Sequence, residues 1–245
     1  MRIAALLSLF ATAAQPACTT DAMLVFDGST SMAEADFNTG APPRIEEARR
    51  AIARALPEIE PYRRVGLMVY GPLGYSGGAG KSGACSGVDL RFGPTENAAA
   101  PIIADINALR PAGLTPLTEA TRRAAEALDY TARPAVVVLL TDGNETCGGR
   151  PCAASAALSA LAHDLTIHVI GFRFSAHDAY FRWNNPEQTF GADNVASCLA
   201  EATGGLFVTT ETVDELTTAL QATLGCALVG DLRGAQPPDA DTIAR

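Results

Sequence analysis

Side chains that carry oxygen gather at three points of this 245-residue sequence, each next to an apolar stretch. The three segments are Asp27-Gly28-Ser29-Thr30-Ser31, Gly113-Leu114-Thr115-Pro116-Leu117 and Thr141-Asp142-Gly143. Ligand sets made only of oxygen suit hard divalent cations such as Mg²⁺, Mn²⁺ or Ca²⁺. The predicted ligands of such a cation are Asp27, Ser29, Ser31, Thr115 and Asp142. Each of these side chains, taken alone, could instead cap a helix or hold a turn.

The pattern Gly80-Lys81-Ser82 is similar to the end of a phosphate-binding loop. The complete motif needs a glycine at position 75, where the sequence has Tyr75. A strand rather than a helix is predicted to follow, so no helix N-terminus would face a phosphate. We therefore interpret this segment as a glycine-rich hairpin at the rim of the predicted site.

Hydrolysis is the catalytic alternative, because Ser29 follows a predicted strand and the sequence has His163, His168 and His177. No Gly-x-Ser-x-Gly elbow is present, and His168 lies inside a predicted strand. His177 lies in a predicted loop, and nothing marks a general acid. We expect a binding protein and not an enzyme, with a metal-dependent hydrolase or a structural domain with a vestigial metal site as alternatives.

The elements that must position these residues alternate between strands and helices. Apolar runs predict strands at 22–26, 65–70, 88–92, 135–140, 165–172 and 206–209. Helical spacing predicts helices at 43–56, 98–109, 118–130, 153–162, 195–203 and 213–224. The fold class is α/β: a doubly wound, mostly parallel six-stranded sheet with one antiparallel edge strand and helices on both faces. Ligands of such sheets bind outside the carboxyl ends of the strands, where the three polar segments should meet.

The N-terminal residues suggest that the protein is exported. Arg2 and the apolar residues 3–14, followed by small residues, predict a signal peptide over 1–14, cleaved after Ala13 or Ala14. The predicted domain covers 18–226, and residues 227–245 read as a flexible tail. A net charge of -9 argues against nucleic acid or an anionic membrane as partner. We expect a periplasmic or secreted protein with no membrane span after cleavage.

Six cysteines lie in the predicted mature chain: Cys18, Cys85, Cys147, Cys152, Cys198 and Cys226. An even number in an oxidising compartment predicts up to three disulfides. Structural zinc is the alternative, since Cys147 and Cys152 are close in sequence, but no second close pair completes a tetrahedral site.

The three polar segments, in this order and at these strand ends, resemble a von Willebrand factor type A domain with its Rossmann-like fold. The stretch Glu145 to Cys152 is similar to one found in the exported bacterial branch of that family. The resemblance implies a metal-ion-dependent adhesion site, in which Ser29, Ser31 and Thr115 bind the ion directly and Asp27 and Asp142 act through water. It also implies an unidentified protein partner that offers an Asp or Glu carboxylate to the ion, and the chain is expected to be a monomer.

The resemblance brings the first strand and the last helix together, which predicts a Cys18–Cys226 bridge. The other four cysteines allow two kinds of pairing. In the first, Cys85 is bonded to either Cys147 or Cys152 and Cys198 to the remaining one; in the second, Cys147–Cys152 is combined with Cys85–Cys198. We prefer the first, because its bridges span a shorter distance across the strands.

The segment 173–194 is long for a strand-to-helix link and rich in aromatic residues. Tyr180, Phe181, Arg182 and Trp183 are its candidate partner-binding residues. These aromatic side chains could instead fold back over the helices.

Overall fold

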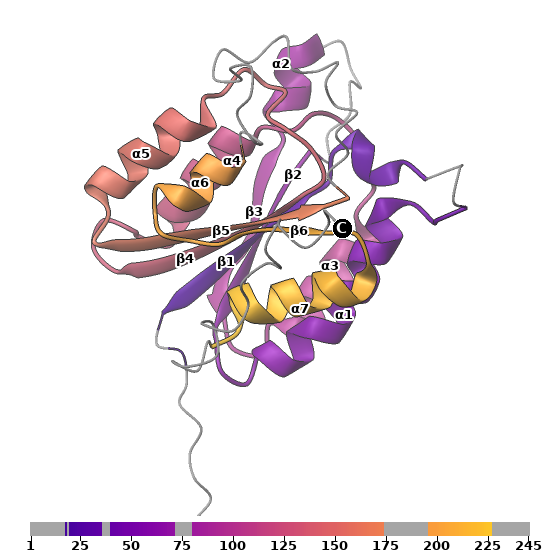
Figure 1. Cartoon of the computed structure of the whole chain (residues 1–245), viewed down its shortest axis with the longest axis horizontal. Helices are drawn as coiled ribbons and strands as arrows, with labels where there is room; N and C mark the ends of the chain where they lie inside the picture. The colour runs from indigo at the N-terminus through magenta and orange to yellow at the C-terminus, as the bar shows by residue number, and fades with distance from the viewer. Residues whose placement is uncertain (1–17, 19, 36–39, 72–79, 174–195, 227–245) are drawn as a thin grey trace, which may run out of the picture.

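A single mixed sheet forms the centre of the computed structural model of the protein, which describes residues 18, 20–35, 40–71, 80–173 and 196–226 (Figure 1). Its six strands lie in the order β3-β2-β1-β4-β5-β6. The strands are β1 (Asp21–Asp27), β2 (Val65–Tyr70), β3 (Val88–Thr95), β4 (Pro134–Thr141), β5 (Asp164–Phe172) and β6 (Phe207–Thr210). All neighbours pair in parallel except β2 and β3, so the predicted sheet with its antiparallel edge strand is confirmed.

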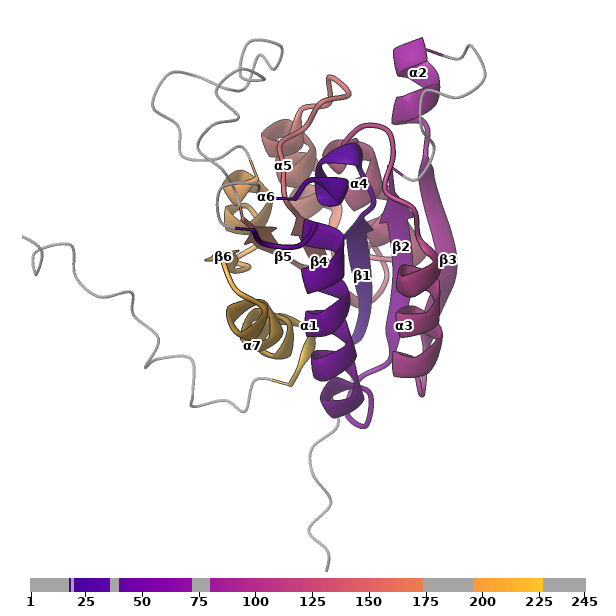
Figure 2. The same cartoon turned by 90° about the vertical axis from the view of Figure 1, so that its right-hand side faces the viewer.

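Helices cover both faces of this sheet. They are η1 (Thr30–Ala33), α1 (Arg44–Ile59), α2 (Gly80–Cys85), α3 (Ala99–Ala108), α4 (Leu117–Ala127), α5 (Pro151–Leu161), α6 (Ser197–Glu201) and α7 (Val213–Leu224). Helices α1, α3 and α7 lie on one face, and α4, α5 and α6 lie on the other (Figures 1 and 2).

Alternation along the central strands divides the core in two. Leu24 and Phe26 of β1 pack toward α1 and α7, whereas Met23 and Val25 pack toward α4. All four side chains are fully buried. Continuous apolar strands are therefore required here, because each face of the sheet is covered by helices.

One local prediction was wrong. Residues Gly80–Cys85 form the short helix α2 rather than a strand, whereas β3 begins at Val88, as predicted. Ala84 of α2 is fully buried, and the Ser86 N–H donates to the Ser82 carbonyl oxygen. The burial of the Ala84 side chain and the closing of one helical turn thus stabilise a helix in a glycine-rich segment whose sequence has a low helix propensity. The turn predicted between β2 and β3 falls partly on residues 72–79, which lie outside the described residues.

Three disulfides tie the elements together: Cys18–Cys226, Cys85–Cys147 and Cys152–Cys198. The Cα atoms of the pairs are 5.7, 5.6 and 5.2 Å apart, within the range that a disulfide spans. The preferred pairing is confirmed, and the zinc alternative for Cys147 and Cys152 is excluded because both form disulfides.

The predicted signal peptide, 1–14, and the predicted tail, 227–245, lie outside the described residues. Within the part of the chain that is described, no helix is long and apolar enough to cross a bilayer.

Candidate metal centre

The two predicted aspartates lie on adjacent strands at the carboxyl edge of the sheet. Asp27 ends β1, and Asp142 directly follows β4, whose Leu140 pairs with Phe26. The Thr141 hydroxyl donates to Asp27 Oδ2 at 2.9 Å, and the Asp142 N–H points to the same oxygen at 3.5 Å. Sheet register therefore fixes the distance between the two carboxylates.

The loop after β1 brings both serines to these carboxylates. The Ser29 N–H donates to Asp27 Oδ1 at 2.7 Å, which folds the loop back over the strand end. The Ser29 and Ser31 Oγ atoms are 2.9 Å apart, and the Ser31 hydroxyl donates to Asp142 Oδ1 at 2.6 Å. Four of the five predicted ligands thus form one hydrogen-bonded group.

Close backbone contact beneath this loop depends on a glycine. Gly71 follows β2 with a φ of +79°, in the left-handed region that other residues avoid. A Cβ atom at this position would lie 2.7 Å from the Ser29 nitrogen. Gly71 therefore lets the second strand end directly under the serine loop.

Thr115, the fifth predicted ligand, is buried with 4% exposure in the loop before α4. Backbone hydrogen bonds attach this loop to the serine loop: the Ala112 N–H donates to the Gly28 carbonyl, and the Thr30 N–H donates to the Gly113 carbonyl. The Thr30 hydroxyl also donates to the Gly113 carbonyl at 3.0 Å. Thr115 is thereby placed on a loop that is fixed to the other ligands through the backbone.

Negative charge accumulates at this edge of the sheet. Asp27 is fully buried and Asp142 is 2% exposed. Burial raises the pKa of the Asp142 carboxyl well above its usual range, and the charge of Asp27 raises it further. The hydrogen bond from Ser31 and the charge of Arg44 act on that pKa in the opposite direction. Two buried carboxylates so close together favour a bound cation.

Arg44 supplies one positive charge at the site, and no motif in the sequence pointed to this residue. Its Nη1 atom lies 3.2 Å from Asp142 Oδ2, from the Ser31 carbonyl oxygen and from Glu34 Oε2. Arg44 is the first residue of α1, 13 positions after Ser31, so only the packing of α1 brings it to the site.

Tyr70 is a second residue that the sequence did not point to. It pairs with Asp27 across β1 and β2 and is fully buried. Its hydroxyl makes no hydrogen bond to any other described residue, although Asp27 and Thr141 are near enough to influence its pKa. Burial raises the pKa of the Tyr70 phenol well above its usual value, and the charge of Asp27 adds to the rise.

The donor set fits a hard divalent cation better than a soft one. Adjacent ligands of an octahedral Mg²⁺ at 2.0–2.1 Å are about 2.8–3.0 Å apart, by simple geometry. The Ser29 and Ser31 oxygens, at 2.9 Å, have this spacing, which also suits the hydrogen bond between them. No group of three or more His, Cys, Asp or Glu side chains suited to a metal occurs among the described residues. The candidate centre therefore depends on hydroxyl oxygens supported by two carboxylates.

Other predicted residues fall elsewhere. Tyr180, Phe181, Arg182, Trp183 and His177 lie outside the described residues, as does most of the 173–194 segment. His168 is within β5, where its Nδ1 accepts the Leu206 N–H at 3.0 Å. His163 directly precedes β5 at the amino end of that strand, away from the carboxyl edge.

Comparison with known proteins agrees with this fold. The family model for the von Willebrand factor type A domain matches residues 21–188. The uncharacterized protein YwmD of Bacillus subtilis (strain 168) is 32% identical over 165 residues, which cover 66% of this chain and 72% of YwmD.

Two solved structures share the fold at low sequence identity. The pilus adhesin SpaC from Lactobacillus rhamnosus GG has a TM-score of 0.57 and 16% identity, over 86% of this chain and 30% of SpaC. Proximal thread matrix protein 1 from the mussel byssus, in a form with a zinc-occupied MIDAS motif, has a TM-score of 0.51 and 15% identity. That match covers 86% of this chain and 48% of the mussel protein. This chain therefore corresponds to less than half of either of these two proteins.

Proposed function

The chain belongs to the von Willebrand factor type A domain family, and from this membership we propose that it binds a divalent cation and holds a partner protein through it. The ligands in this proposal are Asp27, Ser29, Ser31, Thr115 and Asp142. One observation carries it: the hydrogen-bonded group that joins Asp27, Ser29, Ser31 and Asp142 at the carboxyl edge of the sheet.

The residue types indicate how a cation would be held. Ser29, Ser31 and Thr115 would bind directly through neutral hydroxyl oxygens, while Asp27 and Asp142 would act through water and orient the hydroxyls. Neutral direct ligands leave much of the charge of the ion uncompensated, so a bound cation would supply an electrophilic point for an outside carboxylate. Mg²⁺ is the proposed ion, with Mn²⁺ and Ca²⁺ as alternatives of the same ligand preference.

The charges of the residues around the site support an anionic partner group. With both carboxyl groups ionised, Asp27 and Asp142 contribute two negative charges that a dication would balance, and Arg44 adds one positive charge, which the exposed Glu34 partly offsets. A carboxylate of Asp or Glu on a partner protein would then be attracted to the loaded site.

The two solved structures are in line with this proposal. One is an adhesin, and the other has zinc in its MIDAS motif. Three disulfides agree with an oxidising compartment, and we propose that the chain is exported, as its N-terminal sequence predicts. We propose binding rather than catalysis, because the two histidines in the described part of the chain, His163 and His168, do not lie at the carboxyl edge of the sheet.

A calorimetric titration tests the cation half of the proposal. Mg²⁺ and Mn²⁺ are titrated into the wild type and the Ser29→Ala variant, with Ser159→Ala on α5 as the matched control. We expect Ser29→Ala to abolish or strongly weaken the binding and Ser159→Ala to leave it unchanged. Equal affinities in all three proteins would refute the assigned site.

Acetate serves as the probe for the partner half. In NMR titrations of the wild type we expect acetate to shift resonances of the Asp27–Ser31 loop only when Mg²⁺ is present. Shifts that are the same after chelation of the ion, or that are absent in the loaded protein, would contradict a carboxylate-binding role for the cation.

A further inference from the structure

Residues 145–149, which we name the 145–149 clamp, pack against Thr115 and the start of α4. The segment belongs to the Glu145 to Cys152 stretch, for which the proposed function gives no role. It begins three residues after Asp142, so one loop connects the proposed ligand that follows β4 with the surroundings of another proposed ligand, Thr115.

Thr146 makes two hydrogen bonds to the backbone of Thr115. The Thr115 N–H donates to the Thr146 Oγ1 at 2.8 Å, and the Thr146 N–H donates to the Thr115 carbonyl oxygen at 3.0 Å. Two hydrogen bonds between the same pair fix both the position and the orientation of the peptide groups that carry Thr115.

Glu145 fixes the helix that follows Thr115. The residue is 5% exposed, and its Oε2 accepts the Thr118 N–H in the first turn of α4 at 2.9 Å. Its Oε1 accepts the Cys147 N–H at 2.7 Å, within the clamp itself. A buried carboxylate at the amino end of a helix satisfies a free N–H group and is favoured by the helix dipole. Pro116, at the cap position, contributes no N–H of its own.

The clamp is anchored covalently. Cys147 is bonded to Cys85, the last residue of α2, which lies beyond the carboxyl ends of the strands (Figure 2). Gly149 completes the packing, because a Cβ atom there would lie 2.6 Å from Glu145 Oε2 and would also clash with the Thr118 side chain. The sequence thus supplies a carboxylate, a hydroxyl, a disulfide and a glycine, each with a contact that tightens the clamp.

From these contacts we propose that Glu145 and Thr146 are positioning residues for the metal ligand Thr115, and that the Cys85–Cys147 disulfide holds them in place. The inference rests on the proposed cation binding. Neither residue would touch the ion. Their effect on it would pass through the backbone of Thr115, as residues that orient a ligand affect a metal without contacting it.

Four variants test the inference in titrations with Mg²⁺ alone. Thr146→Val removes the Oγ1 acceptor and keeps the shape of the side chain, so we expect a loss of affinity of about 10- to 100-fold. Thr146→Ser keeps a hydroxyl and should restore most of the affinity. The Cys85→Ala/Cys147→Ala variant should weaken binding in the same direction.

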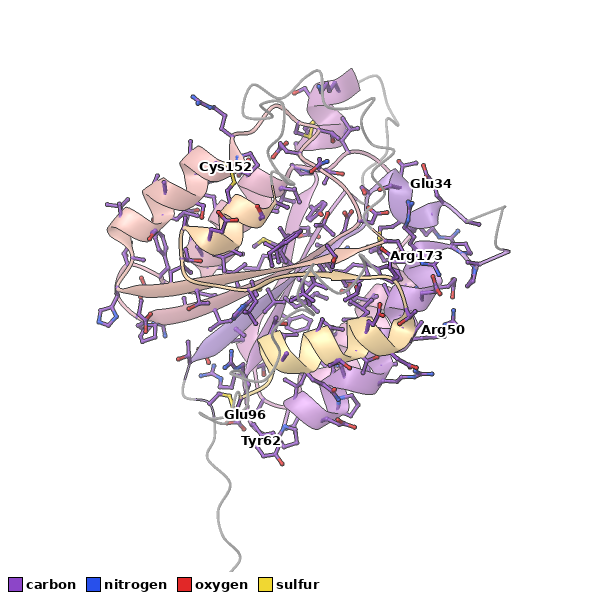
Figure 3. All side chains as sticks on the ribbon, in the orientation of Figure 1. Glu34, Arg50, Tyr62, Glu96, Cys152 and Arg173 are labelled. Carbon is purple, nitrogen blue, oxygen red and sulfur yellow. A yellow bond between two sulfur atoms is a disulfide. The ribbon has the colours of Figure 1, made fainter. Side chains whose placement is uncertain are left out.

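The matched control is Cys152→Ala/Cys198→Ala, which removes a disulfide of similar loop size, with a sequence separation of 46 against 62. Cys152 lies on α5, well apart from Glu34 beside the site (Figure 3). We expect this control to bind Mg²⁺ as the wild type does. If Thr146→Val binds like the wild type, or if both disulfide variants lose affinity equally, the positioning role is refuted.

Amide hydrogen exchange separates this inference from the proposed function, because it needs no ion. We expect the Thr115 and Thr118 amides to exchange faster in Thr146→Val and in Cys85→Ala/Cys147→Ala, and at the wild-type rate in the control. A wild type that binds no Mg²⁺ would refute the cation site, and the positioning role with it, whatever the exchange rates are. Unchanged exchange in a wild type that does bind Mg²⁺ would refute the clamp alone.

Discussion

The charge of Asp27 provides the sharpest test of the site, through the Asp27→Asn variant. Asp27 is fully buried, so its attraction for a cation is screened less than it would be in water. Acting through a bound water, a carboxylate lies about 4 Å from the ion. A dication and a single charge at that distance attract by about 2 kcal/mol even in bulk water, which sets a lower limit. We therefore expect Asp27→Asn to weaken Mg²⁺ binding by roughly 30-fold or more.

Urea unfolding with and without Mg²⁺ measures this loss as a difference in stability. At an ion concentration 100 times the wild-type Kd, Mg²⁺ should raise the free energy of unfolding by about 2.7 kcal/mol, and by at most about 0.9 kcal/mol in the variant. The difference corresponds to about 4–7 °C in Tm for a domain of this size. Each protein is compared with itself, because Asp27→Asn also weakens the hydrogen bond from the Ser29 N–H without any ion.

The control for this experiment is Asp164→Asn, which removes an exposed carboxylate at the amino end of β5. It should gain as much stability from Mg²⁺ as the wild type does. An equal gain in stability from Mg²⁺ in Asp27→Asn would refute the placement of the ion. A cation bound at this edge of the sheet must be attracted by a buried negative charge so close to it.

Three further predictions concern residues around the site and in the core. Arg44→Gln should raise the affinity for Mg²⁺ in calorimetry, because the guanidinium beside Asp142 repels a cation; a lower affinity would show that Arg44 mainly orients that carboxylate. Gly149→Ala should destabilise the fold by about 1–3 kcal/mol in urea unfolding through steric overlap. Gly93→Ala, where a Cβ would meet nothing within 4 Å, should show no such overlap. Burial lowers the pKa of His168 to about 4, and the positive charge of Arg63 contributes to the shift. The folded state then binds fewer protons than the unfolded state between pH 6.5 and 4, so stability is full above pH 6.5 and falls by at most about 3 kcal/mol as the pH drops to 4. His168→Gln should lose this slope in unfolding experiments across that range.

Much of the fold could be predicted from local patterns. The apolar run 135–140 and the run Val65–Tyr70 match β4 and β2 within one residue at each end, because strands buried on both faces must be apolar throughout. The antiparallel edge strand was also predictable, since only the glycine-rich link between β2 and β3 interrupts the alternation of predicted strands and helices. Helix α2 was not, because six residues with three small side chains carry almost no periodicity.

The pairing of the cysteines could be predicted only in part from the sequence. Together with the predicted export, the even number of cysteines predicts disulfides, and the predicted sheet restricts the pairings that can be spanned. It does not decide whether Cys85 joins Cys147 or Cys152. The structure decides it, since Cys147 lies in the clamp next to α2, whereas Cys152 is the second residue of α5 and is bonded to Cys198 of α6.

For the candidate site, the motifs specify the residue types, and the apolar runs before them specify the strand ends at which these residues lie. Because parallel strands end at one edge, Asp27, Ser29, Ser31 and Asp142 had to be neighbours. Only the tertiary structure brought in Arg44. It belongs to no motif and reaches Asp142 because α1 packs against β1 with its first turn at that edge.

Tyr70 and the 145–149 clamp were likewise decided by the tertiary structure. The register of β1 against β2 sets Tyr70 beside Asp27, and the fold of the loop after β4 sets Thr146 against Thr115. Motifs indicate which side chains provide the oxygens, because cation binding restricts the residue types that can serve as ligands. The groups that hold those oxygens in place act through packing, register and backbone hydrogen bonds between distant segments, which no local pattern encodes.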